Sequence, residues 1–284
     1  MTKLGLIAGG GGLPREIVRA CEAADRPLLV IRLRGFADPS LGGEDGVDSG
    51  LGELGRTIKA LKQHGCRAVC FAGLVSRPDF AALKPDLRGM AALPGAIAAA
   101  AKGDDALLRF LAGEFEKEGF VIEGADEVVR DLTLGKGALG RIAPGPKHQL
   151  DIERAMTAAR ALGRLDIGQA VIAARGVILA VEAQEGTDQM LRRCADLPAA
   201  LKGSSDNPVG VLAKAPKPIQ DRRIDLPTIG AATVIAAARC GLAGIVGEAG
   251  GMIVIDRPAV IETANELGLF VVGLDPAEDP VAAS

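Results

Sequence analysis

The sequence predicts an α/β protein in which an N-terminal domain with a Rossmann-like parallel sheet is followed by a second α/β domain. Near the N-terminus, apolar runs at residues 3–8, 28–33 and 68–72 have the length and composition of buried strands. Helical patterns over residues 14–24 and 57–64 separate them. This β-α-β-α-β order predicts parallel strands joined by right-handed crossovers. A length of 284 residues suits two modest domains better than one.

The remaining elements follow from periodicity and turn residues. The first helix begins at Pro14, which suits a first turn because its missing N–H has no partner to lose. Residues 80–117 have a helical pattern, and residues 120–122 have the pattern of a strand. Alternation around Arg175-Gly176 predicts a hairpin. Further along, we expect helices over residues 150–162, 231–241 and 258–267, and strands over 209–214, 244–246, 252–255 and 270–273.

A segment rich in Gly, Pro and Lys, residues 133–149, predicts the linker between the domains. The N-terminal Rossmann-like domain would then comprise residues 1–132. The C-terminal α/β catalytic domain would comprise residues 150–284.

Composition excludes several classes of protein. Trp and Tyr are absent, which argues against base stacking on the aromatic platforms that many RNA-binding modules use. A net charge of −3 without a basic stripe predicts no nucleic-acid partner. No apolar run is long enough to cross a membrane, and the first residues are too short for a signal-peptide core, so we expect a cytoplasmic protein. The five cysteines match no common zinc or redox spacing, which predicts reduced, mostly buried thiols.

The segment 214–230, KAPKPIQDRRIDLPTIG, has the residue types of a phosphate and metal site. Phosphate oxygens need Lys and Arg donors, while Mg²⁺ needs one or two carboxylate oxygens. Three prolines prevent a regular helix. A solvated charged loop is the alternative, but apolar strand and helix patterns flank the segment, so we interpret it as a site. Its cations are Lys214, Lys217, Arg222 and Arg223, and its carboxylates are Asp221 and Asp225.

A glycine run, residues 9–12, ends the first strand and leads into a helix, where backbone N–H groups can bind phosphate. The dinucleotide fingerprint is not met, because Arg15 stands where the third glycine belongs. The second strand also ends in basic residues rather than the acidic residue of an NAD site. A turn without a ligand is the alternative interpretation.

Residues 185–188, Glu-Gly-Thr-Asp, combine a helix cap with a glycine that permits close approach of backbone to a ligand. A plain helix cap is the alternative. Glu182, Glu185 and Asp188 place three carboxylates within seven residues, which favours a hard cation nearby.

Five blocks together resemble a known family, the metal-dependent, two-domain UDP-2,3-diacylglucosamine pyrophosphatases of lipid A biosynthesis. They cover nearly the whole chain in the family's order, and the blocks around residues 185–188 and 220–230 are the specific ones. The blocks are AGGGGLP (8–14), VEAQEGTDQML (181–191), KAPKPIQDRRIDLPTIG (214–230), GLAGIVGEAGG (241–251) and GLFVVG (268–273).

The resemblance implies hydrolysis of the pyrophosphate of UDP-2,3-diacylglucosamine to UMP and 2,3-diacylglucosamine 1-phosphate (lipid X). It implies a Mg²⁺ cofactor, for which Mn²⁺ can substitute, and a substrate bound between the two domains. The aspartate of the family's DLPT block is the one tied to metal-assisted catalysis, and here it is Asp225. We add Asp221 as the second catalytic and metal-binding candidate.

Substrate-binding candidates come from the same blocks and from the predicted linker. They are Gly10, Gly11, Gly12, Leu13, Lys147, Glu185, Gly186, Thr187, Asp188, Lys214, Gln220, Arg222, Arg223 and Thr228. Because the substrate carries two acyl chains, we expect transient, peripheral contact with the inner membrane. An Ala- and Gly-rich surface is compatible with a homodimer. Two other classes stay open from the residues alone: a nicotinamide-dependent oxidoreductase, and a nucleotide or lipid carrier without catalysis.

Overall fold

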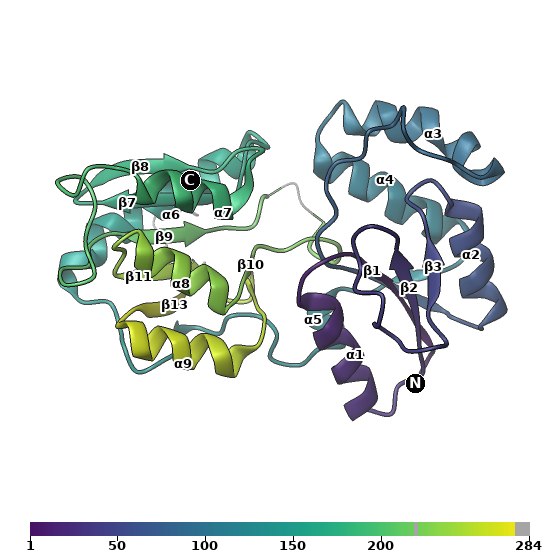
Figure 1. Cartoon of the computed structure of the whole chain (residues 1–284), viewed down its shortest axis with the longest axis horizontal. Helices are drawn as coiled ribbons and strands as arrows, with labels where there is room; N and C mark the ends of the chain where they lie inside the picture. Colours follow the sequence, from purple (N-terminus) through teal and green to yellow (C-terminus); the bar gives the residue numbers. More distant parts are fainter. Residues whose placement is uncertain (219–220, 276–284) are drawn as a thin grey trace. The chain divides into compact units, whose positions relative to one another are not determined.

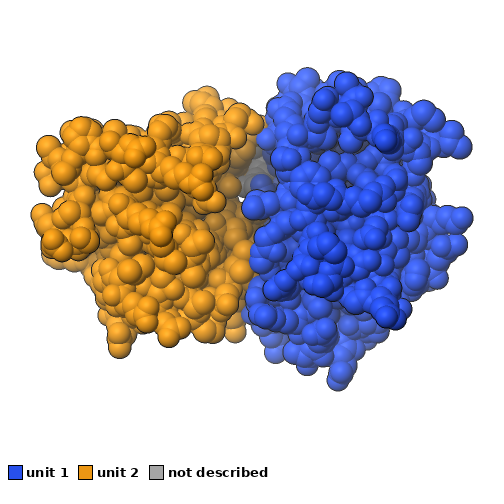
Figure 2. Space-filling view, in the orientation of Figure 1, with its two compact units in different colours: residues 1–130, 221–225 blue, residues 131–220, 226–284 orange. Residues whose placement is uncertain are grey.

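The chain forms two compact units, each with its own sheet and its own hydrophobic core. The computed structural model describes residues 1–218 and 221–275. Figure 2 colours the units: the first comprises Met1–Arg130 with Asp221–Asp225, and the second comprises Asp131–Gln220 with Leu226–Ser284. The α/β fold class predicted from the sequence is confirmed.

A parallel sheet with the strand order β3-β2-β1-β4-β5 forms the centre of the first unit (Figure 1). Its strands are β1 (Leu4–Ala8), β2 (Leu28–Leu33), β3 (Val47–Ser49), β4 (Ala68–Ala72) and β5 (Val121–Ile122). Its helices are α1 (Leu13–Ala23), α2 (Leu54–Gln63), α3 (Leu87–Ala100), α4 (Asp104–Lys117) and α5 (Ala125–Val128). All residues of the central strand β1 are buried, because it has neighbours on both sides and helices above and below. The predicted Rossmann-like parallel sheet is therefore confirmed.

The helical pattern over residues 80–117 forms two helices, α3 and α4, rather than one. Gly103 separates them with a φ of +127°, a conformation that residues with a side chain rarely adopt. Asp104 and Asp105 then begin α4, where negative charge is favoured by the helix dipole. Asp86 caps α3 by accepting a hydrogen bond from the Gly89 N–H at 2.7 Å.

A mixed sheet with the strand order β6-β13-β11-β9-β7-β8 forms the centre of the second unit. Its strands are β6 (Gly137–Ala138), β7 (Ala170–Ala174), β8 (Val177–Val181), β9 (Val211–Lys214), β11 (Gly244–Glu248) and β13 (Phe270–Leu274). The strands β10 (Thr228–Ile229) and β12 (Ile253–Val254) form a separate pair. The helices are η1 (Pro146–His148), α6 (Gln149–Arg164), α7 (Gly186–Ala195), α8 (Ala231–Arg239) and α9 (Arg257–Leu267). β9, β11 and β13 are parallel, and β7 and β8 form the predicted hairpin at Arg175-Gly176.

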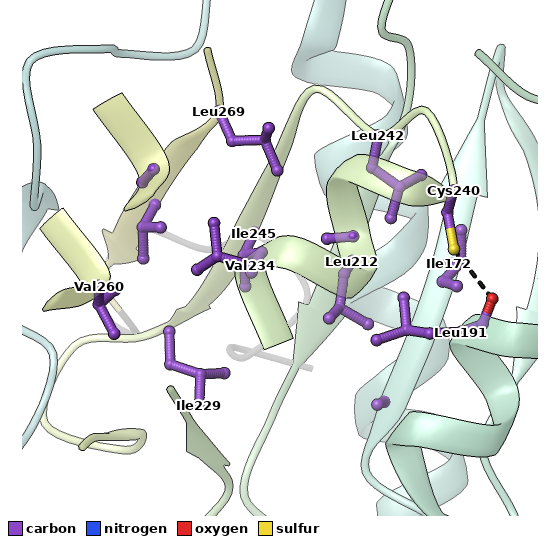
Figure 3. Close-up of a cluster of buried hydrophobic side chains, with 14 of the residues drawn as sticks. Ile172, Leu191, Leu212, Ile229, Val234, Cys240, Leu242, Ile245, Val260 and Leu269 are labelled. Atoms are coloured by element: carbon purple, nitrogen blue, oxygen red, sulfur yellow. Dashed lines mark hydrogen bonds between the residues drawn. The ribbon is translucent and has the colours of Figure 1, made fainter. Parts of the chain in front are cut away.

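Two hydrophobic clusters cover the faces of the second sheet. One includes Ile152 and Met156 of α6, and the other includes Met190, Val234 and Val260 of α7, α8 and α9. Figure 3 shows the second cluster, in which the Cys240 Sγ also donates a hydrogen bond to the Leu191 carbonyl oxygen at 2.9 Å. This packing explains the strand patterns, because a strand covered on both faces reads as a continuous apolar run.

The cysteines are all free and buried, which agrees with the prediction of buried, reduced thiols. Burial raises the pKa of Cys70 to about 12, so this thiol is protonated at neutral pH. Among the helices that the structure describes, none is long and apolar enough to cross a membrane.

Residues 133–149, predicted as a linker, belong to the second unit in the structure. Leu134 is buried in its core, and β6 pairs with the edge of β13. Glycine and proline are compatible with this placement, because Gly273 leaves no room for a Cβ beside Gly135 and Pro146 begins the short helix η1. The short segment Asp221–Asp225 belongs to the first unit in the structure. No change in amino-acid composition marks this segment in the sequence.

Gly273 tests this assignment of the predicted linker. An added Cβ at Gly273 would lie 2.0 Å from the Gly135 carbonyl oxygen, so Gly273→Ala must displace backbone. We expect a loss of about 1–3 kcal/mol, measured by thermal denaturation. Gly113→Ala is the control, because a Cβ there meets nothing within 4 Å and alanine is the better helix former. An unchanged midpoint for Gly273→Ala would contradict the packing.

Candidate active site

The glycine run lies at the carboxyl end of β1, where the strand order reverses between β1 and β4. Ligands of open parallel sheets bind at such a reversal. Here the backbone of Gly10 exchanges two hydrogen bonds with Leu74, each 2.8 Å long, and the Gly9 N–H donates to the Ala72 carbonyl oxygen. Gly9 and Gly10 are therefore needed for close backbone packing, and the Gly10 N–H is already used.

Gly11, Gly12 and Leu13 form the entry to α1. Gly11 has a φ of +84°, which favours glycine, and Gly12 is the N-cap residue. The N–H groups of Gly11 and Gly12 make no hydrogen bond within residues 1–218 and 221–275. The predicted phosphate-binding role needs backbone N–H groups that are not already hydrogen-bonded. Among the described residues, Gly11 and Gly12 meet this condition and Gly10 does not.

The segment Asp221–Asp225 forms a single turn within the first unit. The carbonyl oxygen of Asp221 accepts hydrogen bonds from the N–H groups of Ile224, at 2.9 Å, and Asp225, at 3.2 Å. The Ile224 side chain packs against the hydrophobic cluster that contains Phe115 and Ile122. The turn therefore places Asp225, which is partly buried, on the first unit.

Arg223 pairs with two carboxylates of the first unit. Its Nε and Nη2 donate to both oxygens of Asp221, at 3.0 and 2.7 Å, and its Nη1 donates to Glu116 Oε1 at 3.1 Å. These hydrogen bonds hold the pKa of Asp221 below its usual value. In this structure Arg223 therefore holds the turn, and contact with phosphate stays a prediction.

Lys214 lies at the carboxyl end of β9 in the second unit, opposite Ala170 at the start of β7. Its Nζ donates to Thr187 Oγ1 and to the Thr228 carbonyl oxygen, both at 3.0 Å. Thr187 Oγ1 in turn donates to Glu182 Oε1 at 2.7 Å, and Glu182 Oε2 accepts the Gln169 N–H at 3.0 Å. Lys214 is only 4% exposed and Glu182 only 6%, so a buried cation and a buried carboxylate share one hydroxyl.

The predicted group of three carboxylates does not form a metal site among the described residues. Glu182 points to Thr187 and Gln169, whereas the exposed Glu185 pairs with Arg193 at 2.6 Å. Asp188 is exposed on α7. The three residues are close in sequence, but the end of β8 and the start of α7 turn them to different surroundings.

Two of the remaining candidates lie at the surface. Arg222 and Lys147 are exposed, whereas His148 beside Lys147 is buried, with its ring centroid 5.0 Å from that of Phe270. Lys217 is paired with Asp166 at 2.6 Å. Gln220 lies outside the described residues.

Among the described residues, no group of three or more His, Cys, Asp or Glu side chains could hold a metal. Mg²⁺ does not require one, because it keeps several waters and commonly takes one or two carboxylates together with substrate phosphates. The turn offers two carboxylates, Asp221 and Asp225. Two carboxylates on one turn are a donor set that fits Mg²⁺.

Of three carboxylates that contact the candidate residues, two were not assigned a role from the sequence, and the third was assigned a different one. Glu116 and Asp105 of α4 contact the turn, and Glu182 contacts Thr187. Asp105 and Glu116 lie more than a hundred positions before the turn, and nothing local in the sequence marks them. Glu182 was noticed in the sequence as a carboxylate at the end of a strand, but we interpreted it as a metal ligand. In the structure it accepts hydrogen bonds from Thr187 and Gln169.

Both domains of one family match the chain. Residues 3–132 match the LpxI N-terminal domain, and residues 135–272 match the LpxI C-terminal domain. The UDP-2,3-diacylglucosamine pyrophosphatase LpxI of Caulobacter vibrioides is 62% identical over 280 residues, which cover 99% of this chain and 100% of the relative.

Two solved structures are more distant. CobK precorrin-6A reductase is 15% identical, with 97% of this chain and 88% of that chain covered and a TM-score of 0.35. The N5-carboxyaminoimidazole synthase of Aspergillus clavatus is 13% identical, with 74% and 45% covered and a TM-score of 0.23. Scores this low support no conclusion about function.

The two α/β units, together with the family matches, define a two-domain α/β enzyme. The matches span both units in order and nearly the full length. The chain belongs to the LpxI family, as its motifs indicated.

Thr187→Val tests the buried network in the second unit. The substitution keeps the shape of the side chain but leaves Lys214 and Glu182 each without one hydrogen-bond partner. We expect a loss of about 1–3 kcal/mol in the free energy of unfolding, measured in urea. Thr187→Ser keeps the hydroxyl and serves as the control. Equal stability of the two variants would contradict the network.

Proposed function

We propose that this protein hydrolyses the pyrophosphate bond of UDP-2,3-diacylglucosamine and releases UMP and 2,3-diacylglucosamine 1-phosphate (lipid X). The observation that carries the proposal is the relative of that name, which is 62% identical and aligned over its whole length. The same relation supports a place in lipid A biosynthesis. A carrier without catalysis would bind the substrate but release no UMP, and nicotinamide binding would mark an oxidoreductase.

A Mg²⁺ ion, with Mn²⁺ as a substitute, is part of the proposal. When bound, such an ion supplies charge neutralisation at phosphate oxygens and makes water easier to ionise. We propose that the Asp225 carboxylate holds it and that Asp221 is the second candidate. Asp225 is the first candidate because it is the aspartate of the DLPT block, residues 225–228. Arg223 keeps Asp221 ionised, because its Nε and Nη2 donate to both oxygens of that carboxylate.

The other residues bind and orient the substrate in this proposal. The N–H groups of Gly11 and Gly12 point from the N-terminal end of α1, where an anion is favoured. Arg222 is exposed and offers a guanidinium to phosphate. In the second unit, the shared hydroxyl of Thr187 fixes Lys214, and the N-terminus of α7 presents further backbone N–H groups.

We also propose transient contact with a membrane surface through the outer face of α3. Its fourteen residues include one charged side chain, Arg88, whose Nη2 lies 3.1 Å from Glu114 of α4 and 3.3 Å from Glu118 at the C-cap of α4. Leu87, Met90 and Ile97 are nevertheless exposed, at 82%, 50% and 46%. A surface helix with an apolar outer face requires a partner, and a substrate with two acyl chains makes a lipid surface the fitting one.

Asp225→Ala tests the catalytic role. We expect UMP release to fall by orders of magnitude while the circular dichroism spectrum stays that of the unaltered protein, because the carboxylate is on a turn and not in the core. EDTA should abolish UMP release by the unaltered protein, and Mg²⁺ should restore it. Asp206→Ala, at an exposed loop position of the second unit, is the control. Near-normal hydrolysis by Asp225→Ala would refute the role.

The membrane contact is tested by co-sedimentation with vesicles that contain anionic lipid. Met90→Glu and Ile97→Glu should reduce the bound fraction several-fold, because a charge must then leave water. Leu165→Glu, at another exposed apolar position, should bind like the unaltered protein. Binding that is insensitive to the α3 changes would exclude this face.

A further inference from the structure

The backbone of the turn that carries Asp225 is tied to the first unit at Asp221. Its N–H donates to Asp105 Oδ1 at 3.3 Å, and its carbonyl oxygen accepts the Asp225 N–H at 3.2 Å. Two hydrogen bonds and the backbone of one residue, Asp221, therefore connect the carboxylate of Asp105 to the backbone of Asp225.

Asp105 lies in the first turn of α4, and its side chain is 6% exposed. Its Oδ2 lies 2.8 Å from Arg109 Nη2, in a geometry that brings the charges together without making a hydrogen bond. A buried carboxylate is costly unless its charge and lone pairs are matched. The contact with the Asp221 N–H is therefore part of what makes this buried charge tolerable.

The neighbouring residue shows that a helix N-terminus does not by itself account for Asp105. Asp104 is in the same turn of α4, yet its side chain is 46% exposed and lies 3.6 Å from Arg77. Both carboxylates interact favourably with the helix dipole. Only Asp105 faces the turn that carries Asp225.

We propose that Asp105 is a positioning residue for Asp225, a role that rests on the proposed function for its kinetic consequence. The Asp105 carboxylate holds the Asp221 N–H in place by a hydrogen bond. The Asp221 carbonyl oxygen in turn holds the Asp225 N–H in place. The Ile224 side chain in the core and the pair between Arg223 and Glu116 hold the same turn from its other side. Asp105 touches neither substrate nor reacting atoms in this role.

Steady-state hydrolysis of UDP-2,3-diacylglucosamine tests the kinetic consequence in the full-length protein. Asp105→Ala should lower kcat by about tenfold or more and leave KM within a few-fold, because small misplacement of a catalytic group is costly. Asp105→Asn keeps an acceptor oxygen and should recover most of kcat. Asp104→Ala is the matched control and should behave like the unaltered protein.

A double substitution separates positioning from general structural damage. In an Asp225→Ala background, Asp105→Ala should lower kcat no further, because the residue it positions is already gone. If Asp105→Ala does not fold, Asp105→Glu keeps the charge but moves the acceptor oxygen, and it should also lower kcat. A normal kcat in folded Asp105→Ala or Asp105→Glu, an effect of these substitutions on KM alone, or a full additional loss in the Asp225→Ala background would overturn the proposal.

Hydrogen exchange tests the contact without any activity. Asp105→Ala should accelerate exchange of the amides of residues 221–225, with Asp104→Ala unchanged. Unchanged exchange in Asp105→Ala would overturn the positioning role. If the unaltered protein does not hydrolyse UDP-2,3-diacylglucosamine, the proposed function fails, while faster exchange in Asp105→Ala still supports the role of Asp105 in holding the turn.

Discussion

Buried strands must find hydrogen-bond partners for every backbone N–H and C=O group, and both units meet this constraint with sheets whose central strands are parallel. Parallel strands end at the same edge. The glycine run follows β1, Glu182 follows β8, and Lys214 ends β9. Within each unit, the ladder of backbone hydrogen bonds in the sheet fixes where the residues at the ends of its own strands lie.

The second constraint is the cost of burying charge. Lys214, Glu182 and Asp105 are almost completely buried, and each is tied to a backbone group or a hydroxyl. In water such groups would be solvated, so inside the fold they need defined partners. This requirement turns residues that look like ligand-binding charges into residues that hold loops in place, and it leaves fewer side chains for direct contact with substrate.

The segment 214–230 illustrates the difference between residue type and role. Four cations and two carboxylates looked equivalent in the sequence. In the structure Lys217 pairs with Asp166, Lys214 joins an internal network, and Arg223 binds Asp221 and Glu116. Arg222 is exposed, and Asp225 lies partly buried on the turn. Local spacing could not predict this division, because the partners Asp166 and Glu116 come from other elements.

The sequence by itself determined the α/β class, the parallel sheet of the first unit, the hairpin and the family, because periodicity and contiguous motifs are local properties. Only the tertiary structure decided that residues 133–149 belong to the second unit and that residues 221–225 belong to the first. It also decided that Asp105 meets Asp221. These outcomes depend on backbone pairing and burial between residues far apart in the chain, and a one-dimensional pattern does not record which distant groups satisfy one another.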